Sequence, residues 1–323
     1  MANRLSAQAG SERSGGPAFE RSGRFRVRGS VNKPTIVVTG ASGQVGFELQ
    51  RTLQCLGHVV PCDRATLDLS DLARVREFIR RTAPSIIVNP AAYTAVDRAE
   101  TDEVMAMRIN AELPATLAQE AASLGAVLVH YSTDYVFDGQ KAGPYVEDDQ
   151  PNPQNVYGKS KLAGELGIAA AACAHLILRT SWVYGRRGKN FLLTMQRLAA
   201  ERPELKVVDD QIGAPTWSRT IAEATGQIIS QGIAANSSQW WWERSGVYHL
   251  TAAGETSWCG FAKAILQRDG NHADTVVVPI SSREYPTPAA RPSNSRMSAA
   301  KISTVFGLHM PAWDEALGLC LGD

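Results

Sequence analysis

Short apolar segments alternate with longer amphipathic segments along the chain from Pro34 onwards. Four short segments are almost entirely hydrophobic: TIVVTG, HVVPCD, SIIVNPAA and AVLVHYST. The segments between them, residues 44–56, 71–82 and 102–124, carry apolar residues at helical spacing. Strands that are apolar on both faces and alternate with helices are typical of a parallel sheet covered on each side. The pattern therefore predicts an α/β fold with a doubly wound, Rossmann-like parallel sheet.

The second half of the chain continues this alternation and then becomes less regular. HLILRTS and KVVDD predict two further strands, with a helix near residues 190–201 between them. We expect a smaller substrate-binding domain that is interleaved with the first, and we assign tryptophans 240–242 to its packing. The expected division is 1–33 as a disordered tail, 34–181 as the dinucleotide-binding domain with 206–235 returning to it, and 182–205 with 236–323 as the smaller domain.

Composition narrows the class of protein. The chain has 44% hydrophobic and 20% charged residues and a formal charge of +1, which are values of a globular protein with no bias towards nucleic acids or anionic membranes. Its five cysteines show no C-x-x-C spacing, so we expect reduced thiols, a cytoplasmic location and no metal site.

The composition of residues 1–33 differs from that of the rest of the chain. This segment holds six arginines and one lysine against two glutamates, and it has few large apolar residues. A solvated tail or an upstream start codon explains this segment better than a transit peptide does.

Three glycines follow the first predicted strand in the sequence TGASGQVG. Gly40 permits a tight turn, Gly43 lets backbone amides approach a pyrophosphate, and Gly46 lets the helix pack closely on the sheet. The amino-terminal end of the helix then offers free N–H groups to phosphates. The context of strand, glycines and helix predicts a dinucleotide site, and the alternative is a tight turn without a ligand.

The end of the second predicted strand indicates the adenosine end of such a site. Asp63 stands where an acid binds the ribose hydroxyls, which favours NAD, and Arg64 follows, which favours the 2′-phosphate of NADP. Either NADH or NADPH is therefore expected. In DLSD, Asp68 and the Leu69 backbone can hold the adenine, or Ser70 or Asp71 can simply cap the next helix.

NVYGKSKLAGE places Tyr157 and Lys161 four residues apart, on one face of a helix. A hydride that reaches a ketone carbon leaves an alkoxide, and a tyrosine hydroxyl can supply its proton. An unperturbed phenol has a pKa near ~10, so a lysine ammonium one turn away is expected to lower that pKa. Thr133, at the end of the fourth predicted strand, can orient the carbonyl oxygen. The alternative for this pair is a half-exposed aromatic residue beside a solvated charge.

These residues resemble the extended short-chain dehydrogenase/reductases. Seven segments are similar, more narrowly, to the dTDP-4-dehydrorhamnose reductase family: GQVGFELQRTL, AAYTAVDRAE, HYSTDYVFDG, NVYGKSKLAGE, RTSWVYG, DDQIGAPT and YPTPAARPSNSRM. The resemblance runs from about Thr35 to the end of the chain. It implies reduction of the 4-keto group of dTDP-4-dehydro-6-deoxy-L-mannose to dTDP-L-rhamnose.

The resemblance also implies roles for particular residues. Thr133, Tyr157 and Lys161 would be catalytic, and Thr133 would also contact the substrate. The implied cofactor contacts are Gly43, Gln44, Val45, Asp63, Asp68, Leu69, Ala92, Tyr93, Thr94 and Tyr131, together with Tyr157 and Lys161. The implied substrate contacts are Asp134 and Trp182, with Asn190 and Arg291 at the diphosphate. A core tryptophan and a surface salt bridge are the alternatives for Trp182 and Arg291.

Other readings stay open. A different nucleotide-sugar ketoreductase or epimerase would share the glycines and the Tyr157–Lys161 pair, and a regulatory subunit would bind the dinucleotide without turnover. Pro90 replaces a small residue of the family and removes a backbone donor near the cofactor loop. Some relatives are thought to dimerise around a metal, but Arg219 stands where an acid would be needed beside Glu48, so no metal bridge is expected. A homodimer is among the alternatives for the oligomeric state.

Overall fold

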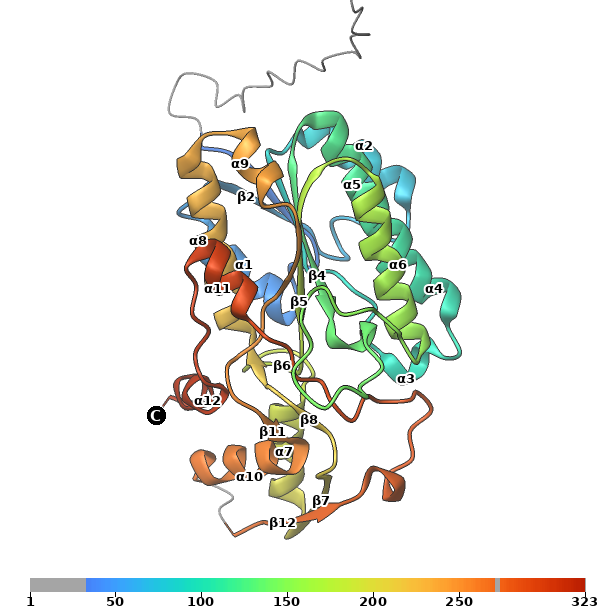
Figure 1. The fold of residues 1–323 in the computed structure, drawn as a ribbon, viewed down its shortest axis with the longest axis vertical. Coiled ribbons are helices and arrows are strands. Elements are labelled where there is room, and N and C mark those ends of the chain that lie inside the picture. Colours follow the sequence, from blue (N-terminus) through green and yellow to red (C-terminus); the bar gives the residue numbers. More distant parts are fainter. Residues whose placement is uncertain (1–32, 271–273, 323) are drawn as a thin grey trace, which may run out of the picture.

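The computed structural model describes residues 33–270 and 274–322, so the expected tail lies outside the described residues except for Lys33. Within these residues, a six-stranded parallel sheet forms the centre of the larger part of the molecule (Figure 1). From one edge to the other the strands are β2 (His58–Pro61), β1 (Thr35–Val38), β3 (Ile86–Asn89), β4 (Val127–Thr133), β5 (Ala174–Thr180) and β10 (Gly246–His249). Every neighbouring pair is parallel. The predicted doubly wound sheet is confirmed.

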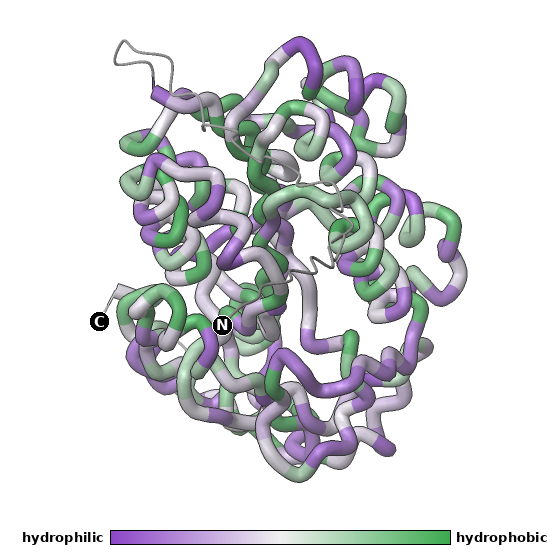
Figure 2. Tube along the Cα trace, turned by 45° about the horizontal axis from the view of Figure 1, so that its top comes forward, coloured by the Kyte–Doolittle hydropathy of each residue, from purple (hydrophilic) through white to green (hydrophobic). Residues whose placement is uncertain are grey.

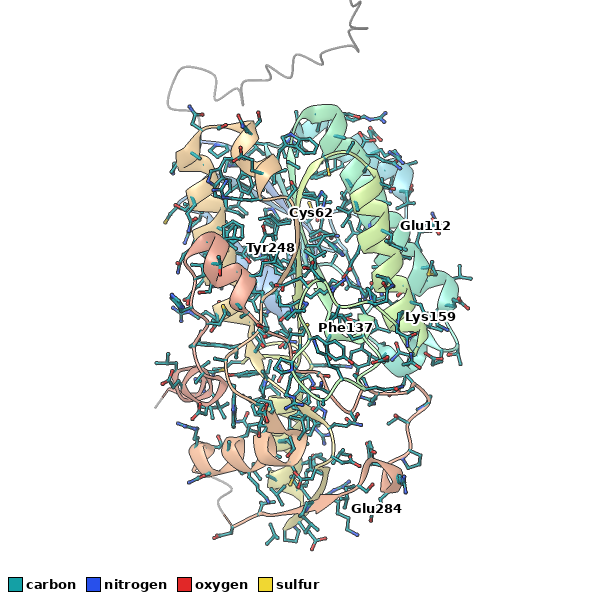
Figure 3. The ribbon with its side chains drawn as sticks, in the orientation of Figure 1. Cys62, Glu112, Phe137, Lys159, Tyr248 and Glu284 are labelled. Carbon is teal, nitrogen blue, oxygen red and sulfur yellow. The ribbon has the colours of Figure 1, made fainter. Side chains whose placement is uncertain are left out.

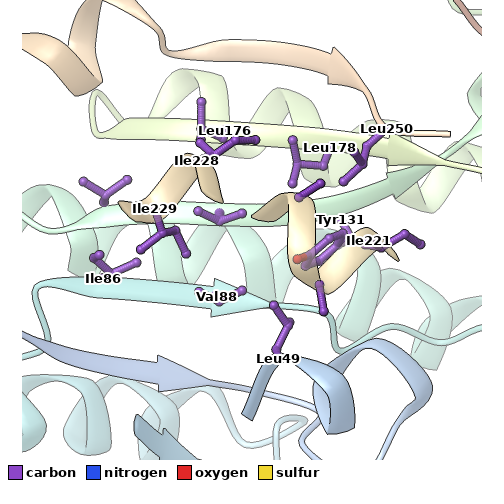
Figure 4. Close-up of a cluster of buried hydrophobic side chains, with 14 of the residues drawn as sticks. Leu49, Ile86, Val88, Tyr131, Leu176, Leu178, Ile221, Ile228, Ile229 and Leu250 are labelled. Carbon is purple, nitrogen blue, oxygen red and sulfur yellow. The ribbon is translucent and has the colours of Figure 1, made fainter. Parts of the chain in front are cut away.

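Helices cover both faces of this sheet. One face packs against α1 (Gln44–Leu53), α8 (Ser218–Ala235), α9 (Ser238–Glu243) and α11 (Ala300–Phe306). The other face packs against α2 (Leu72–Thr82), α5 (Leu113–Leu124) and α6 (Val156–Ala170). In the first of these cores, Ile228 of α8 lies beside Leu176 of β5, and Ile221 lies beside Tyr131 of β4 (Figure 4). The strands are apolar on both faces because each face is buried under helices.

The helix predicted over 102–124 is interrupted. It divides into α4 (Glu103–Met107), a π-helical turn η1 (Arg108–Glu112) and α5, and a short α3 (Val96–Ala99) precedes it. Pro114, in the first turn of α5, has no N–H to donate to the carbonyl of Asn110, so the regular bonding cannot continue there. The carbonyl faces α6, where a Cβ on Gly164 would lie 2.1 Å from it. The interruption thus lets α6 approach closely.

A smaller part of the molecule lies beyond the carboxyl ends of β4 and β5 (Figure 1). Its helices are α7 (Phe191–Glu201), α10 (Trp258–Asp269) and α12 (Trp313–Leu321), which share a third core. Its strands form three pairs: β7 (Glu204–Val208) with β12 (Val276–Ile280), β8 (Ile212–Gly213) with β11 (Thr256–Ser257), and β6 (Val183–Tyr184) with β9 (Thr216–Trp217). Two short 3-10 helices follow strands: η2 (Asp134–Val136) follows β4 of the main sheet, and η3 (Ser282–Glu284) follows β12 of the smaller part. The carboxyl edge of the main sheet therefore faces this second layer.

Three segments differ from the expected domain division. Residues 206–217 were expected in the larger domain, but β7 and β8 pair with strands of the smaller part. Residues 246–249 were expected in the smaller domain, but β10 extends the main sheet beside β5. Trp241, assigned to the smaller domain, is buried in the core of the larger part. Strand pairing decided the first two placements and packing in the hydrophobic core decided the third, and both join residues that are far apart in the sequence.

The distribution of hydropathy follows this architecture. The central strands are predominantly hydrophobic and the connecting loops predominantly hydrophilic (Figure 2). None of the helices that the structure describes combines the length and hydropathy needed to cross a membrane.

Candidate active site

The three glycines form a tight turn between β1 and α1. Gly40 has a φ of +53°, in the region that disfavours other residues, and a Cβ there would lie 3.0 Å from the Ala91 backbone. A Cβ on Gly46 would lie 2.2 Å from the carbonyl oxygen of Gly40, so only glycine allows α1 to start this close to the turn. No side chain caps the amino-terminal end of α1. The turn therefore offers a close-packed backbone with helix N–H groups available, which fits a dinucleotide pyrophosphate.

The acids expected at the adenosine end are held by local turns. Oδ1 of Asp63 accepts hydrogen bonds from the Ala65 and Thr66 amides and from the Thr66 hydroxyl, each 3.0 Å long. The hydrogen bonds with Thr66 lower the pKa of Asp63, so it is ionised at neutral pH. Asp68 accepts from Ser70, while Asp71 caps α2 by accepting from the Arg74 amide. The helix cap expected from Ser70 or Asp71 is thus made by Asp71. The adenine contact expected from Asp68 and the Leu69 backbone stays a prediction.

The loop after β3 is held by Asn110, a residue that no sequence motif singles out. Oδ1 of Asn110, in η1, accepts from the Tyr93 amide (2.8 Å), and its Nδ2 donates to the Tyr93 carbonyl (3.1 Å) and to the Ser160 hydroxyl of α6 (3.0 Å). The Tyr93 hydroxyl donates to Asp102. Ala92 and Thr94 thus belong to a loop fixed on both sides of the tyrosine. Pro90 lies just beyond the last paired residue of β3, so it removes no bond of the sheet.

Tyr157 and Thr133 meet at the carboxyl edge of the sheet. Asn155 caps α6 by accepting from the Gly158 amide and donates to the Ala290 carbonyl, which fixes the start of the helix that carries Tyr157. The Tyr157 ring packs edge-on against Tyr135, with the centroids 5.5 Å apart. Burial raises the pKa of Tyr157 to about 12, and a hydrogen bond with Thr133 opposes that rise. The structure therefore brings the phenol and the threonine hydroxyl together, as expected.

The ammonium of Lys161 is hydrogen bonded to the neighbouring strand β4. Its Nζ hydrogen bonds join it to the Tyr131 carbonyl oxygen at 2.5 Å and to Nε2 of His130 at 3.1 Å. Burial lowers the pKa of Lys161 to about 8, and the carboxylate of Glu165 opposes this change. The expected lowering of the Tyr157 pKa by Lys161 stays a prediction, because burial sets the pKa of the phenol in this structure. Lys159, in contrast, is exposed on the outer face of α6 and points away from the sheet (Figure 3).

Tyr131 contributes to the site through its backbone alone. Its ring lies on the opposite face of β4, in the core beneath α1 and α8 (Figure 4). Its hydroxyl is hydrogen bonded to Thr225 at 2.7 Å. The expected cofactor contact of Tyr131 therefore stays a prediction for its backbone, because successive side chains of a strand point to opposite faces and its ring faces the core. Only its carbonyl faces Lys161.

Of the two residues expected at the deoxysugar, Asp134 contacts Thr133, and Trp182 packs against the smaller part of the molecule. Asp134 accepts from the Thr133 hydroxyl, while its other oxygen, Oδ2, is buried without a hydrogen-bond partner among the described residues. Burial raises the pKa of Asp134 to about 6. Trp182 has a φ of +47°, a strained backbone for a bulky residue, and stacks on Trp258 with the centroids 3.6 Å apart. It is partly exposed, so it is not the core tryptophan of the alternative reading.

Asn190 and Arg291, expected at the diphosphate, already have protein partners. Asn190 caps α7, and its Nδ2 donates to Oε1 of Gln44 at 2.9 Å and to two loop carbonyls. It thereby joins the first turn of α1 to the smaller part of the molecule. Arg291 forms an ion pair with Asp97 at 2.7 Å, which is the salt bridge of the alternative reading. Arg219 pairs with Glu223, and no group of potential metal ligands occurs among the described residues.

Comparisons with known proteins agree with this geometry. A family model described as the RmlD substrate binding domain matches residues 34–323. A dTDP-4-dehydrorhamnose reductase from Burkholderia thailandensis is 47% identical over 294 residues, which cover 89% of this chain and 98% of that protein. A solved dTDP-4-dehydrorhamnose reductase from Clostridium acetobutylicum has a TM-score of 0.81 at 38% identity and covers 89% of this chain and 98% of its own.

A second solved structure, dTDP-4-dehydrorhamnose reductase from Bacillus anthracis in complex with NADP, has a TM-score of 0.80 at 37% identity. It covers 89% of this chain and 98% of its own. The similarity thus spans both the main sheet and the smaller part of the molecule, in sequence and in fold. The chain belongs to the family of the RmlD substrate binding domain and of the dTDP-4-dehydrorhamnose reductases that resemble it.

Proposed function

We propose that this chain catalyses the NAD(P)H-dependent reduction of the 4-keto group of dTDP-4-dehydro-6-deoxy-L-mannose to give dTDP-L-rhamnose. Family membership supports the substrate class and the cofactor. The single observation that supports the chemistry is the contact between the Tyr157 phenol and the Thr133 hydroxyl at the carboxyl edge of the sheet. In open α/β sheets this edge is where ligands bind.

The residues that would hold the cofactor lie along the carboxyl edge of β1, β2 and β3. The set comprises Gly40, Gly43, Gln44, Val45, Gly46, Asp63, Arg64, Asp68, Leu69, Ala92, Tyr93 and Thr94. When bound, NADPH or NADH supplies the hydride that reduces the carbonyl carbon. The tight glycine turn and the uncapped start of α1 support this placement.

Tyr157 donates its Oη proton to the oxygen of the reduced carbonyl. The high pKa of Tyr157 keeps that proton in place at neutral pH, and the hydroxyl of Thr133 orients the acceptor oxygen. Lys161, one helical turn away, provides the positive charge that stabilises the resulting phenolate. Two of its three ammonium N–H groups are used by β4, which leaves one for a ribose hydroxyl.

Asp134 and Trp182 would bind the deoxysugar. The unpartnered Oδ2 of Asp134 can accept a hydrogen bond from a sugar hydroxyl, and satisfying it removes the penalty of a buried unpaired oxygen. The indole of Trp182 suits the apolar face and 6-methyl group of a deoxysugar. Asn190 would then act on the diphosphate indirectly, through Gln44. Arg291 would contact it through guanidinium N–H groups that its ion pair with Asp97 does not use.

The change Tyr157→Phe tests this proposal. We expect the fold and cofactor binding to be retained and the turnover number to fall ~10²–10⁴-fold, the usual contribution of a positioned proton donor. The rate is followed as loss of reduced-nicotinamide absorbance with the keto-sugar nucleotide. Tyr184→Phe is the matched control and should keep wild-type turnover, because the Tyr184 hydroxyl is buried in the smaller part and has no hydrogen-bond partner among the residues that the structure describes.

The same assay separates the alternative functions. Cofactor binding without oxidation by any keto-sugar nucleotide would support a regulatory subunit and contradict the reductase. Oxidation with a different keto sugar, but not with this one, would support another ketoreductase of the superfamily. The homodimer considered from the sequence stays a prediction, which sedimentation velocity of the full chain tests.

A further inference from the structure

A row of buried polar side chains crosses the main sheet beneath the site. The Thr39 hydroxyl donates to Oδ1 of Asn89 (2.5 Å), the Asn89 amide contacts Nδ1 of His130 (2.9 Å), and Nε2 of His130 contacts Lys161 Nζ (3.1 Å). All four residues are at most 1% exposed. Thr39 directly precedes Gly40, so the row runs from the glycine turn to Lys161 through β3 and β4. Such a row is tolerated only when each member is satisfied.

The row imposes a constraint on the histidine. A neutral imidazole has one N–H donor and one acceptor nitrogen. If Lys161 is an ammonium that donates to Nε2, the proton must sit on Nδ1, and Asn89 must present its oxygen to the ring. If Asn89 presents its NH2 group to Nδ1, as in the hydrogen bonds given above, then Nε2 carries the proton and Lys161 must be a neutral amine. A half-turn of the Asn89 amide, which exchanges its oxygen and nitrogen, converts this second arrangement into the first. Burial and the charge of Lys161 lower the pKa of His130 well below its usual value, so the ring stays neutral in both cases.

We propose that His130 is a positioning residue for Lys161. While Lys161 is an ammonium, Nε2 of His130 accepts a hydrogen bond from it, and the Asn89 side chain is turned so that its oxygen accepts from Nδ1–H and its NH2 group donates to the Thr39 hydroxyl. This inference deepens the proposed function and rests on it, because Lys161 is the residue that His130 positions. Loss of the proton from Lys161 reverses the tautomer and turns the Asn89 amide. The charge state of Lys161 is thus linked to the side chains beside the glycine turn.

Several other charged groups surround α6. The charged and titratable groups on α6 itself and on the elements packed against it are Tyr157, Lys159 and Glu165 on α6, His130 and Tyr131 on β4, His175 and Arg179 on β5, Asp134 and Tyr135 on η2, Arg108 and Glu112 on η1, Glu103 on α4, Asp97 and Arg98 on α3, and Glu120 on α5. Arg179 pairs with Glu165, and Arg108 pairs with Glu112. Glu165 is the one whose charge acts on Lys161, and it favours the ammonium. His130 is the one that contacts Nζ directly.

Two substitutions separate positioning from packing. His130→Leu keeps a similar volume but removes the acceptor, so the buried ammonium loses one of its two partners. His130→Gln restores an acceptor oxygen for Lys161 and an amide for Asn89. We expect the alkaline limb of kcat/KM, which Lys161 sets, to move about one pH unit lower in His130→Leu. In His130→Gln it should stay within about 0.3 unit of wild type. The proposal would be overturned if the alkaline limb of kcat/KM lay at the same pH in all three proteins, or if both variants shifted it by the same amount.

A measurement without cofactor or substrate keeps this inference independent of the reaction. In long-range ¹H–¹⁵N spectra of the wild-type protein at pH 6, we expect His130 as the neutral Nδ1–H tautomer, changing to Nε2–H as the pH is raised through the titration of Lys161. A charged ring or an Nε2–H tautomer at pH 6 would refute the inference even if the enzyme turns over. The expected tautomer in a protein that reduces no keto sugar would leave this inference standing and refute the proposed function.

Discussion

The buried ion pair between Arg179 and Glu165 should be among the most sensitive positions of the fold. Arg179 on β5 donates from Nε to Oε1 of Glu165 at 2.9 Å and from Nη2 to Oε2 at 2.6 Å. The two side chains are 4% and 5% exposed. Glu165 lies on α6, the helix that also carries Tyr157 and Lys161, so the pair fixes that helix to the sheet. Arg179→Met removes one partner and leaves a carboxylate buried alone.

Leaving one member of a buried pair uncompensated typically costs about 3–5 kcal/mol of the free energy of unfolding. For a domain of this size that corresponds to a decrease in Tm of roughly 6–20 °C. Urea denaturation followed by circular dichroism measures the first quantity, and a thermal melt measures the second. Arg197→Met is the matched control, because the pair of Arg197 with Glu201 is 60% and 51% exposed and such pairs contribute about 0.5 kcal/mol or less.

The pH dependence of the loss provides a second check. In Arg179→Met the buried carboxylate of Glu165 favours its protonated form, so the folded state binds a proton more readily than the unfolded state does. The variant therefore gains stability relative to wild type as the pH falls towards 5. A double variant that also carries Glu165→Leu should recover most of the loss, because no charge is left to bury. A loss below about 1 kcal/mol, or one that is the same at pH 7 and pH 5, would refute the reasoning.

Three further predictions concern the cofactor, the pH profile and the tail. Gly46→Ala places a Cβ 2.2 Å from the Gly40 carbonyl oxygen and should raise the Kd for NADPH at least ~10-fold by fluorescence titration. Gly143→Ala, which faces open space, should leave that Kd unchanged. Lys161 loses its proton as the pH rises through its pKa of about 8, so kcat/KM should fall about tenfold per unit above that value, and a limb only above pH 10 would contradict this. Removal of residues 1–33 should leave turnover unchanged, since the family match begins at residue 34, and a large drop would show that the tail takes part.

Much of the fold was predictable from local patterns. The apolar strands and amphipathic helices occur close to where the periodicity places them, because burial on both faces of a sheet leaves a direct mark on sequence. The glycine turn was predictable for a similar reason, since its conformation and close contacts exclude other residues locally. The pairing of Tyr157 with Thr133 followed from two carboxyl-edge elements being adjacent in a parallel sheet.

The partners of buried polar groups were not predictable in this way. Helical spacing suggested that Lys161 acts on Tyr157, yet its ammonium bonds to His130 and the Tyr131 carbonyl on the neighbouring strand. Likewise, nothing in the sequence around Asn110 shows that a π-helical turn directs its amide to the loop after β3. Such partners depend on the register and distance between elements that are remote in the chain.

The sequence by itself determined the succession of strands and helices along the chain, the glycine turn and the identity of the groups that can do chemistry. The tertiary structure alone decided that β10 completes the main sheet, that Tyr131 faces the core, and that a buried row ending at His130 holds Lys161. The physical reason is that periodicity records which face of an element is buried. Hydrogen-bond partners and charge states, in contrast, are set by what the folded chain packs against that face.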